Sequence, residues 1–370
     1  MSYNRILVKL GTNLLTGNSE HLSLETMSSL VGQMARLHKQ GLDVIVVSSG
    51  AIAAGRQRLG PIKGRKETPF KQVLAAVGQS RLMDAYDQLF GWHEITIAQT
   101  LLTRTDLTDR LSYLNARNTL LMLLELRVVP IVNENDVVAV DEIREAQFGD
   151  NDNLSALVAS LVDADLLMIL TDKAGLYSAD PDKDPNAQLI QCIDRIDESI
   201  ECLAGASSST RGTGGMATKI EAAKLATASG VAVVIADGRE HDIVTRLAAG
   251  ESIGTYFRPT TSKLESRKRW LLSQISRGSL AIDSGAIKAI RTQNKSLLPA
   301  GITRTIGSFE RGEVVNVLDN ETDTEVACGI TNYSSDEINT IKGAHSDRIA
   351  ELLGYEYGTE VVHRDNLVVF

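Results

Sequence analysis

The sequence has few of the residues that build disulfide scaffolds and metal centres. Its cysteines are Cys192, Cys202 and Cys328, an odd number at scattered positions, which excludes a disulfide framework and favours a reducing, cytoplasmic setting. The six histidines lack the spacing of metal ligands and no Cys-x-x-Cys pair occurs, so we expect no zinc centre. A G-x-S-x-G motif is also missing, which leaves a hydrolase triad without support.

Excess positive charge and long hydrophobic runs are lacking too. The net charge is −9, so gross electrostatics disfavour nucleic acid and anionic membranes as partners. Asp163 and Asp165 interrupt the longest apolar region, 154–170, and Arg5 and Lys9 interrupt the apolar stretch near the start. We therefore expect neither a membrane span nor a signal peptide. Apolar residues at 43% and charged residues at 23% are typical of a globular protein.

Short apolar runs alternate with helical patterns over the first two-thirds of the chain. Strands are expected at 6–8, 43–47, 94–98, 128–132, 166–170 and 231–235. Helices are expected around 27–37, 111–126, 153–162 and 216–228. This alternation predicts an α/β fold with a mainly parallel sheet covered on both faces. In such sheets ligands bind outside the carboxyl ends of the strands.

The pattern changes after residue 258. We expect a first domain over 1–258, a connector over 259–277, and a small, mainly β domain over 278–370. Within the last segment, strand-like runs occur at 314–318 and 360–362. Its eight basic and fourteen acidic residues give this segment a net charge of −6.

Two glycine-containing segments carry a lysine suited to phosphate. Lys9 ends the first expected strand and precedes a glycine turn whose backbone N–H groups can face an anion. The segment GTGGMATK at 212–219 leads into an expected helix, with Lys219 one turn inside. The spacing is not that of a Walker loop. It does match G-x-G-x-x-A with Asp237 farther on, so a dinucleotide site stays an alternative.

Polar residues gather after several expected strands. These clusters are SSGAIAAG at 48–55, NEND at 133–136, GDNDN at 149–153 and TD at 171–172. Their carboxylates and amides can hold an amino group, order a lysine or ligate Mg²⁺, although each cluster alone also fits a solvated turn or a helix cap. No general base stands out, which fits phosphoryl transfer to an acceptor that is already anionic, such as a carboxylate.

The ordered series of motifs resembles the glutamate 5-kinase family. The series is VKLGT at 8–12, SSGAIAAG at 48–55, AAVGQSRL at 75–82, LNAR at 114–117, IVNEND at 131–136, GDNDNLSA at 149–156, TD at 171–172 and GTGGMATK at 212–219. Farther on, GSLAIDSGA at 278–286, SLLPAGI at 296–302 and FERGEVV at 309–315 resemble the PUA domain of the bacterial enzymes. The resemblance covers nearly the whole chain.

The resemblance implies an amino-acid-kinase three-layer sandwich that phosphorylates the γ-carboxylate of L-glutamate with ATP, the first step of proline biosynthesis from glutamate. It implies that Lys9 and Lys219 stabilise the transferring phosphoryl group and that Asp152 orients both lysines. The implied ATP-binding residues are Lys9, Thr171, Asp172, Thr213, Gly214, Gly215, Met216, Ala217, Thr218 and Lys219. The implied glutamate-binding residues are Ser49, Asp136 and Asn151. Mg²⁺ is expected mainly through the ATP phosphates. Asn13 and Ala217 stand where the family leads us to expect serine.

The resemblance also implies feedback inhibition by proline, a homo-oligomer of four chains, and hand-off of the product to glutamate-5-semialdehyde dehydrogenase. Alternatives with the same fold are N-acetylglutamate kinase, aspartokinase, carbamate kinase and uridylate kinase, of which the first two favour Gly-Gly where Gly11-Thr12 stands here. RNA binding is an alternative of another class, since PUA domains accompany RNA enzymes and Lys288, Arg291 and Lys295 could form a basic patch. The negative charge of 278–370 favours a structural or regulatory role instead.

Overall fold

The chain folds into two compact units. The computed structural model describes residues 3–17, 19–60, 67–139, 151–181, 183–206, 215–266 and 276–370. The first unit comprises Met1–Thr108 and Asn115–Lys263, and the second comprises Asp109–Leu114 and Leu264–Phe370. The division after Lys263 falls within the expected connector 259–277, of which residues 267–275 lie outside the described ranges. The exact domain boundaries remain a prediction.

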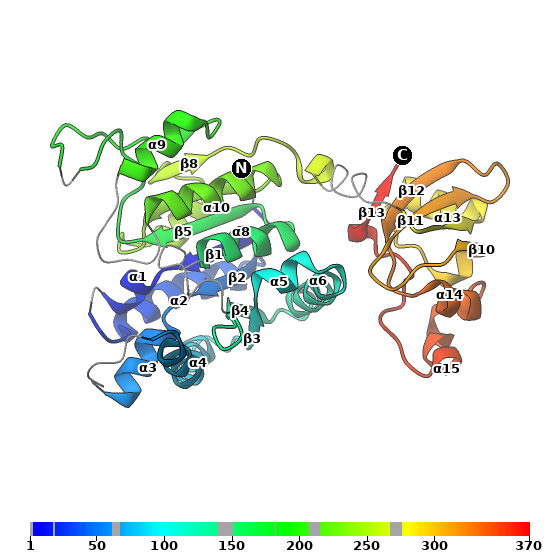
Figure 1. Cartoon of the computed structure of the whole chain (residues 1–370), viewed down its shortest axis with the longest axis horizontal. Helices are drawn as coiled ribbons and strands as arrows, with labels where there is room; N and C mark the ends of the chain where they lie inside the picture. Colours follow the sequence, from blue (N-terminus) through cyan, green and yellow to red (C-terminus); the bar gives the residue numbers. More distant parts are fainter. Residues whose placement is uncertain are drawn as a thin grey trace. The chain divides into compact units, whose positions relative to one another are not determined.

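The first unit is built on a mainly parallel sheet, as the alternating pattern predicts (Figure 1). The order of its eight described strands is β3-β4-β2-β1-β5-β7-β8-β6. Their bounds are β1 Arg5–Leu10, β2 Asp43–Ser48, β3 Ile97–Leu102, β4 Val129–Glu134, β5 Leu166–Thr171, β6 Cys192–Ile193, β7 Ala232–Asp237 and β8 Thr255–Phe257. β8 is antiparallel to β7, whereas the ladders from β3 through β7 are parallel. The carboxyl ends of six strands therefore share one edge.

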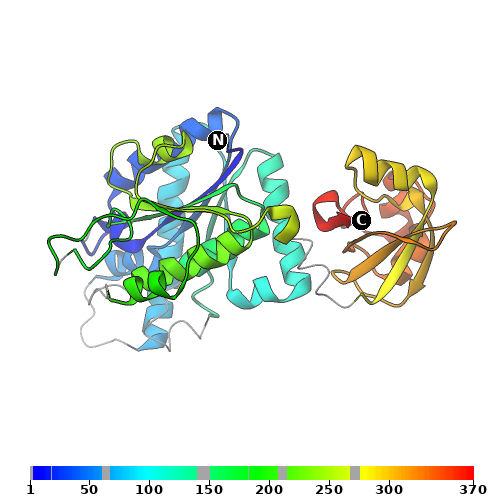
Figure 2. The same cartoon turned by 90° about the horizontal axis from the view of Figure 1, so that it is seen from above.

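Helices cover both faces of this sheet (Figures 1 and 2). The helices α2 (Leu24–Lys39) and α4 (Thr68–Gly91) share a core with Ile6, Val8 and Leu10 of β1. Successive side chains of a strand point to opposite faces, so Lys9 points to the other face. There α8 (Asn151–Leu161) packs on β1 and β5, and α10 (Met216–Ala228) packs on α8 and β7. This register directs Lys9 toward the amino-terminal turns of α8 and α10.

The remaining described helices of the first unit are shorter, apart from α6. They are α1 Thr12–Thr16, α3 Ala51–Leu59, α5 Arg104–Thr108, α9 Glu198–Ala206, α11 Ile243–Ala248 and α6 Arg110–Glu125, whose residues 110–114 are grouped with the second unit. Helices α3 and α4 approach each other closely because glycines face backbone at their contact. A Cβ on Gly78 would lie 1.8 Å from the carbonyl oxygen of Ala51, and one on Gly55 would lie 1.9 Å from that of Leu74. Neither position has room for a larger residue.

The second unit has its own core and a five-stranded, mostly antiparallel sheet, in the order β10-β9-β11-β12-β13. Its strands are β9 Gly278–Ile282, β10 Ile302–Gly307, β11 Val314–Asp319, β12 Glu325–Ile330 and β13 Leu367–Val369. Its helices are α13 Ser284–Gln293, α14 Ser335–Ile341 and α15 Ile349–Leu353, with short 3-10 turns at Pro299–Gly301, Ser346–Arg348 and Arg364–Asn366. A small, mainly β second domain is thereby confirmed. None of the helices in the described part of the chain is long and apolar enough to cross a bilayer.

Some predicted elements differ from the structure. The strand expected at 94–98 exists but its bounds are wrong, because Glu94 adopts a φ of 60° in the turn after α4 and β3 runs from Ile97 to Leu102. The strand expected at 360–362 is also wrong, since Val362 forms only an isolated bridge with Leu297. Helix α4 was not predicted. Its contact surface includes small residues such as Ala75 and Gly78, which weaken an apolar pattern.

Candidate active site

Lys9 lies near the carboxyl end of the central strand. In the sheet register it stands beside Val47 of β2 and Ile169 of β5. The chain leaves β1 for β2 on one side and later returns to β5 on the other, which makes this a topological switch point where α/β folds bind ligands. Gly11, two residues farther on, is the N-cap of helix α1. The Lys9 side chain is only 6% exposed, so partners within the fold must compensate its charge.

Lys9, Asp152 and Lys219 form one buried ionic cluster. Lys9 Nζ lies 2.5 Å from Asp152 Oδ1, and Lys219 Nζ lies 3.1 Å from Asp152 Oδ2. Asp152 is fully buried in the first turn of α8. Burial would raise the pKa of this carboxyl, but the two ammonium groups and a hydrogen bond from Thr218 hold it well below its usual range. One carboxylate thus holds two cations from different elements at a single place.

The amino-terminal turn of α10 completes this cluster. Gly215 caps the helix, and Met216 and Ala217 form the start of its first turn. The Thr218 hydroxyl lies 2.8 Å from Asp152 Oδ2 and 2.9 Å from the carbonyl oxygen of Gly215. Free N–H groups at a helix start attract phosphate. Thr213 and Gly214, which were also expected to bind ATP, lie outside the described residues.

A chain of hydrogen bonds joins polar side chains at the ends of β2 and β4. Asn151 Nδ2 donates to Ser49 Oγ at 3.0 Å and to Asn133 Oδ1 at 3.1 Å. Asn133 Nδ2 in turn donates to Gln79 Oε1 of α4 at 2.8 Å. Because Asn151 and Asp152 are neighbours at the start of α8, this chain lies directly beside the lysine cluster.

Asp136 lies in the turn that follows β4, three residues beyond Asn133. Burial raises the pKa of its carboxyl to about 6. A half-buried carboxylate whose charge is uncompensated gains most from a cationic ligand. Asp136 is therefore suited to hold an ammonium group in the segment that follows β4.

Thr171 and Asp172 lie together at the end of β5. The Thr171 hydroxyl donates to Asp172 Oδ1 at 3.1 Å. Arg239 Nη2 donates to the backbone oxygen of Asp172 at 2.8 Å and also pairs with Asp237 at 2.6 Å. Burial would raise the pKa of Asp237, but the hydrogen bonds from Arg239 hold it below its usual range. This carboxylate is bound to Arg239, and the element described before the 212–219 glycines is helix α9 instead of a strand. Both observations oppose the dinucleotide alternative.

Two kinds of comparison with known proteins agree, one with a protein-family model and one with individual proteins. Residues 4–237, more than half of the chain, match the model of the amino acid kinase family. A glutamate 5-kinase of Dehalococcoides mccartyi is 56% identical over 99% of this chain and 98% of its own length. Those of Herpetosiphon aurantiacus and Shewanella oneidensis are 53% and 48% identical, over 99% and 100% of this chain and 98% of their own lengths. The chain belongs to the amino acid kinase family, in its glutamate 5-kinase group. Residues 278–353 match the PUA domain.

A solved UMP kinase from Bacillus anthracis is also similar, with 14% identity and a TM-score of 0.46 over 70% of this chain and 98% of its own. The membership in the glutamate 5-kinase group rests on the full-length relatives.

The structure brings most residues expected from this family to one edge of the sheet. Direct contacts join Lys9, Lys219 and Asp152, and a second set joins Ser49 to Asn151. Thr171 ends β5, the strand beside Lys9, because Ile169 of β5 pairs with Lys9 in the sheet. Gln79 was not among the predicted site residues, and Asn133 was predicted only as a member of the polar cluster at 133–136. A glutamine within a stretch of small and apolar residues, AAVGQ, was the signal that could have found the first.

The described residues offer no cage for a metal ion. No group of three or more His, Cys, Asp or Glu side chains suited to a metal occurs in the described ranges. Both carboxylate oxygens of Asp152 face lysine ammonium groups. Divalent ions prefer several oxygen ligands, so Mg²⁺ fits this site only as part of a nucleotide substrate that brings its own phosphate oxygens.

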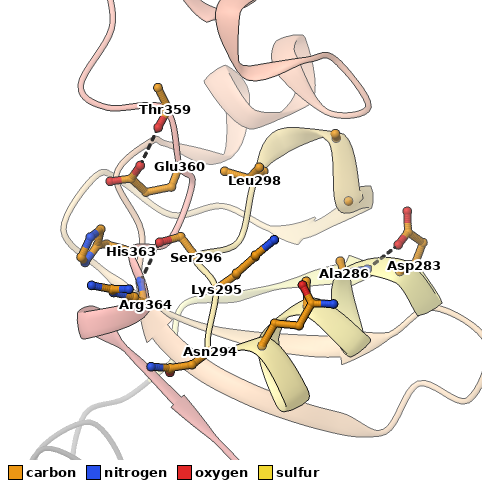
Figure 3. Close-up of a pocket in the computed structure, with 15 residues that line it drawn as sticks. Asp283, Ala286, Asn294, Lys295, Ser296, Leu298, Thr359, Glu360, His363 and Arg364 are labelled. Atoms are coloured by element: carbon orange, nitrogen blue, oxygen red, sulfur yellow. Dashed lines mark hydrogen bonds between the residues drawn. The ribbon is translucent and has the colours of Figure 1, made fainter.

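The second unit, which includes the PUA match and is called the PUA unit below, contains a cavity of about 720 Å³ (Figure 3). Lys295, His363 and Arg364 line it, and so do the carboxylates of Asp283 and Glu360. Lys288 and Arg291, the other members of the expected basic patch, are not among its lining residues. Its mixed charge differs from the continuous basic surface that tracks a nucleic-acid backbone.

Proposed function

We propose that this chain transfers the γ-phosphoryl group of ATP to the γ-carboxylate of L-glutamate, giving L-glutamyl 5-phosphate and ADP, as the first step of proline biosynthesis from glutamate. The observation that carries the proposal is the buried cluster in which Lys9 and Lys219 both contact Asp152. The full-length similarity to glutamate 5-kinases supports the choice of substrate.

The reaction needs charge stabilisation more than proton transfer. A γ-carboxylate oxygen of glutamate attacks the γ-phosphorus, the bond to the β–γ bridging oxygen breaks, and ADP leaves with that electron pair. The attacking carboxyl, with an ordinary pKa of about 4.3, is already ionised at neutral pH and loses no proton. Lys9 and Lys219 face the negative charge that spreads over the phosphoryl oxygens. Asp152 holds both ammonium groups in place before the substrates bind.

The other side chains position the two substrates. In this proposal Ser49, Asn151 and Asp136 hold glutamate, with Asp136 opposite the α-ammonium group. The nucleotide lies on the start of α10, against the segment 213–219 and beside Thr171 and Asp172. Mg²⁺ enters with ATP and neutralises part of the phosphate charge.

The reaction is tested with purified protein, Mg-ATP, L-glutamate and hydroxylamine, measuring ADP together with γ-glutamyl hydroxamate. We expect hydroxamate that depends on glutamate. Lys219→Ala removes one of the two cations, so we expect kcat to fall by about 10²- to 10³-fold, the cost of losing one group that stabilises the transition state.

Lys224→Ala is the matched control, because Lys224 lies on the same helix but is exposed and pairs with Glu201. It should leave kcat unchanged. Parallel reactions contain N-acetylglutamate, aspartate or UMP in place of glutamate. Faster turnover of any of these would assign the chain to a different reaction within the same fold.

The remaining expectations from the family are proposals that the same preparation tests. Adding proline to the hydroxamate assay tests feedback inhibition, and light scattering after gel filtration tests for a tetramer. Because an acyl phosphate is labile, the reaction that consumes this product should follow quickly. We propose hand-off to glutamate-5-semialdehyde dehydrogenase in the cytoplasm.

A further inference from the structure

The hydrogen-bond chain beside the lysine cluster has a fixed direction. Asn151 Nδ2 lies 3.4 Å from the backbone oxygen of Ser48, which can only accept a hydrogen bond. At the other end, Gln79 Oε1 accepts from Asn133 Nδ2, so Asn133 presents its own oxygen to Asn151. If the amides were reversed, Asn151 Oδ1 would face the Ser48 oxygen, and two acceptors would repel each other. The Ser48 oxygen therefore imposes the orientation of Asn151, and Asn133 and Gln79 are oriented to match it, with Gln79 Nε2 buried and without a partner among the described residues.

The orientation of Asn151 determines which hydrogen-bonding groups the site presents to a ligand. Asn151 Oδ1 is buried and has no hydrogen-bond partner among the described residues. A buried carbonyl oxygen without a donor is unfavourable and is best relieved by an N–H group. The Ser49 hydroxyl already accepts a hydrogen bond from Asn151, so its proton can be donated elsewhere. An acceptor and a donor thus stand side by side, with the carboxyl of Asp136 farther along the segment that follows β4.

We propose that Gln79 is a positioning residue that determines the site's selectivity for a dicarboxylate carrying an ammonium group on Cα. Gln79 fixes Asn133, Asn133 fixes Asn151, and Asn151 then presents an oxygen to the ammonium while Ser49 presents a proton to a carboxylate. This inference rests on the proposed function for the position of the substrate. It adds a residue of α4 that acts through its neighbours and need not touch the substrate.

The test compares L-glutamate with glutarate, which has the same two carboxylates and lacks the ammonium group. Binding is measured by calorimetry and kcat/KM by ADP release, for the wild type and three variants. Gln79→Met keeps the size of the side chain but removes the acceptor, so Asn133 is no longer held and can turn its amide away from Asn151, which keeps only its contacts with Ser48 and Ser49. We expect the preference for glutamate over glutarate to fall by about tenfold or more, through weaker glutamate binding, with glutarate unchanged.

Gln79→Glu keeps an oxygen that accepts from Asn133, so this variant should retain the wild-type preference. Gln88→Met makes the same change at an exposed position of the same helix and should also retain it. Melting temperatures verify that each variant is folded, and Gln79→Leu replaces Gln79→Met if the latter is not.

Two results would overturn the inference. One is a folded Gln79→Met protein with the wild-type preference. The other is an equal loss for both dicarboxylates, which indicates a general structural role. Because the binding measurement needs no turnover, a protein that binds glutamate selectively but does not phosphorylate it would contradict the proposed function alone.

Discussion

At the scale of single residues, the site uses burial in two opposite ways. Asp152 is fully buried yet its pKa is lowered, because Lys9 and Lys219 outweigh the cost of desolvation. An acid whose pKa is lowered by folding stabilises the folded state above its unfolded pKa, and this contribution is lost as the pH falls. Among the described residues no lysine or arginine pairs with Asp136, and burial raises its pKa to about 6. The negative charge of Asp152 is therefore already compensated by two lysines, whereas Asp136 is suited to bind a cationic ligand.

This difference predicts how glutamate binding depends on pH. Between pH 7 and 5 Asp136 takes up a proton in the empty protein, while the γ-carboxyl of glutamate, with a pKa of about 4.3, stays mostly ionised. We expect the KM for glutamate to rise as the pH falls through 6. In Asp136→Asn the KM should be higher at pH 7 and nearly independent of pH over this range. A wild-type KM that is flat from pH 7 to 5 would contradict the role of Asp136.

The same titration has a consequence for stability with the opposite sign from that of Asp152. The folded state of the empty protein holds the Asp136 proton more tightly than the unfolded chain does, so ionisation of Asp136 lowers the free energy of unfolding as the pH rises from about 4 to about 6. Bound glutamate should recover this loss above pH 6, where its ammonium group meets the ionised carboxylate.

At the scale of secondary-structure elements, the sequence predicted strands and helices best where the residues of the element are buried along its whole length. Strands β1, β2, β5 and β7 have continuous apolar runs, and helix α10 has the predicted bounds, 216–228. Strand β3 lies at the edge of the sheet and is only partly buried, so its boundaries could not be derived from an apolar run. Strand ends also indicated the edge where Lys9 and Thr171 lie. The contacts that join Gln79 to Asn133 depend on the packing of α4, which the sequence pattern did not reveal.

The contact between α3 and α4 gives a prediction about stability. In Gly78→Ala the new Cβ would meet the backbone of Ala51 at 1.8 Å, so the two helices must move apart. We expect a loss of about 3 kcal/mol or more in the free energy of unfolding, at the upper end of the range for overpacked cores. Chemical denaturation of the purified variants measures it.

Gly91→Ala, at the end of the same helix, is the control, because a Cβ there has no atom within 4 Å. It should be neutral or slightly stabilising, since alanine favours helix over glycine. Equal stability of both variants would contradict the close contact.

At the scale of the whole molecule, charge separates the kinase function from RNA binding. Nucleic-acid affinity comes largely from basic side chains that neutralise phosphates. The chain has a net charge of −9, and the cavity of the PUA unit contains Asp283 and Glu360 beside Lys295, His363 and Arg364. Lys9 and Lys219, by contrast, are buried against Asp152 and do not contribute to a basic surface.

We therefore expect the full-length protein to give no gel shift with single-stranded or hairpin RNA at about 150 mM salt, and only a weak shift at about 50 mM. Such a weak shift should disappear steeply with added salt, as counterion release requires. Lys295→Glu should leave the hydroxamate activity unchanged, because this residue belongs to the second unit and the lysine cluster to the first. A shift that resists 150 mM salt and is lost in Lys295→Glu would show that the PUA cavity binds RNA despite the negative charge around it.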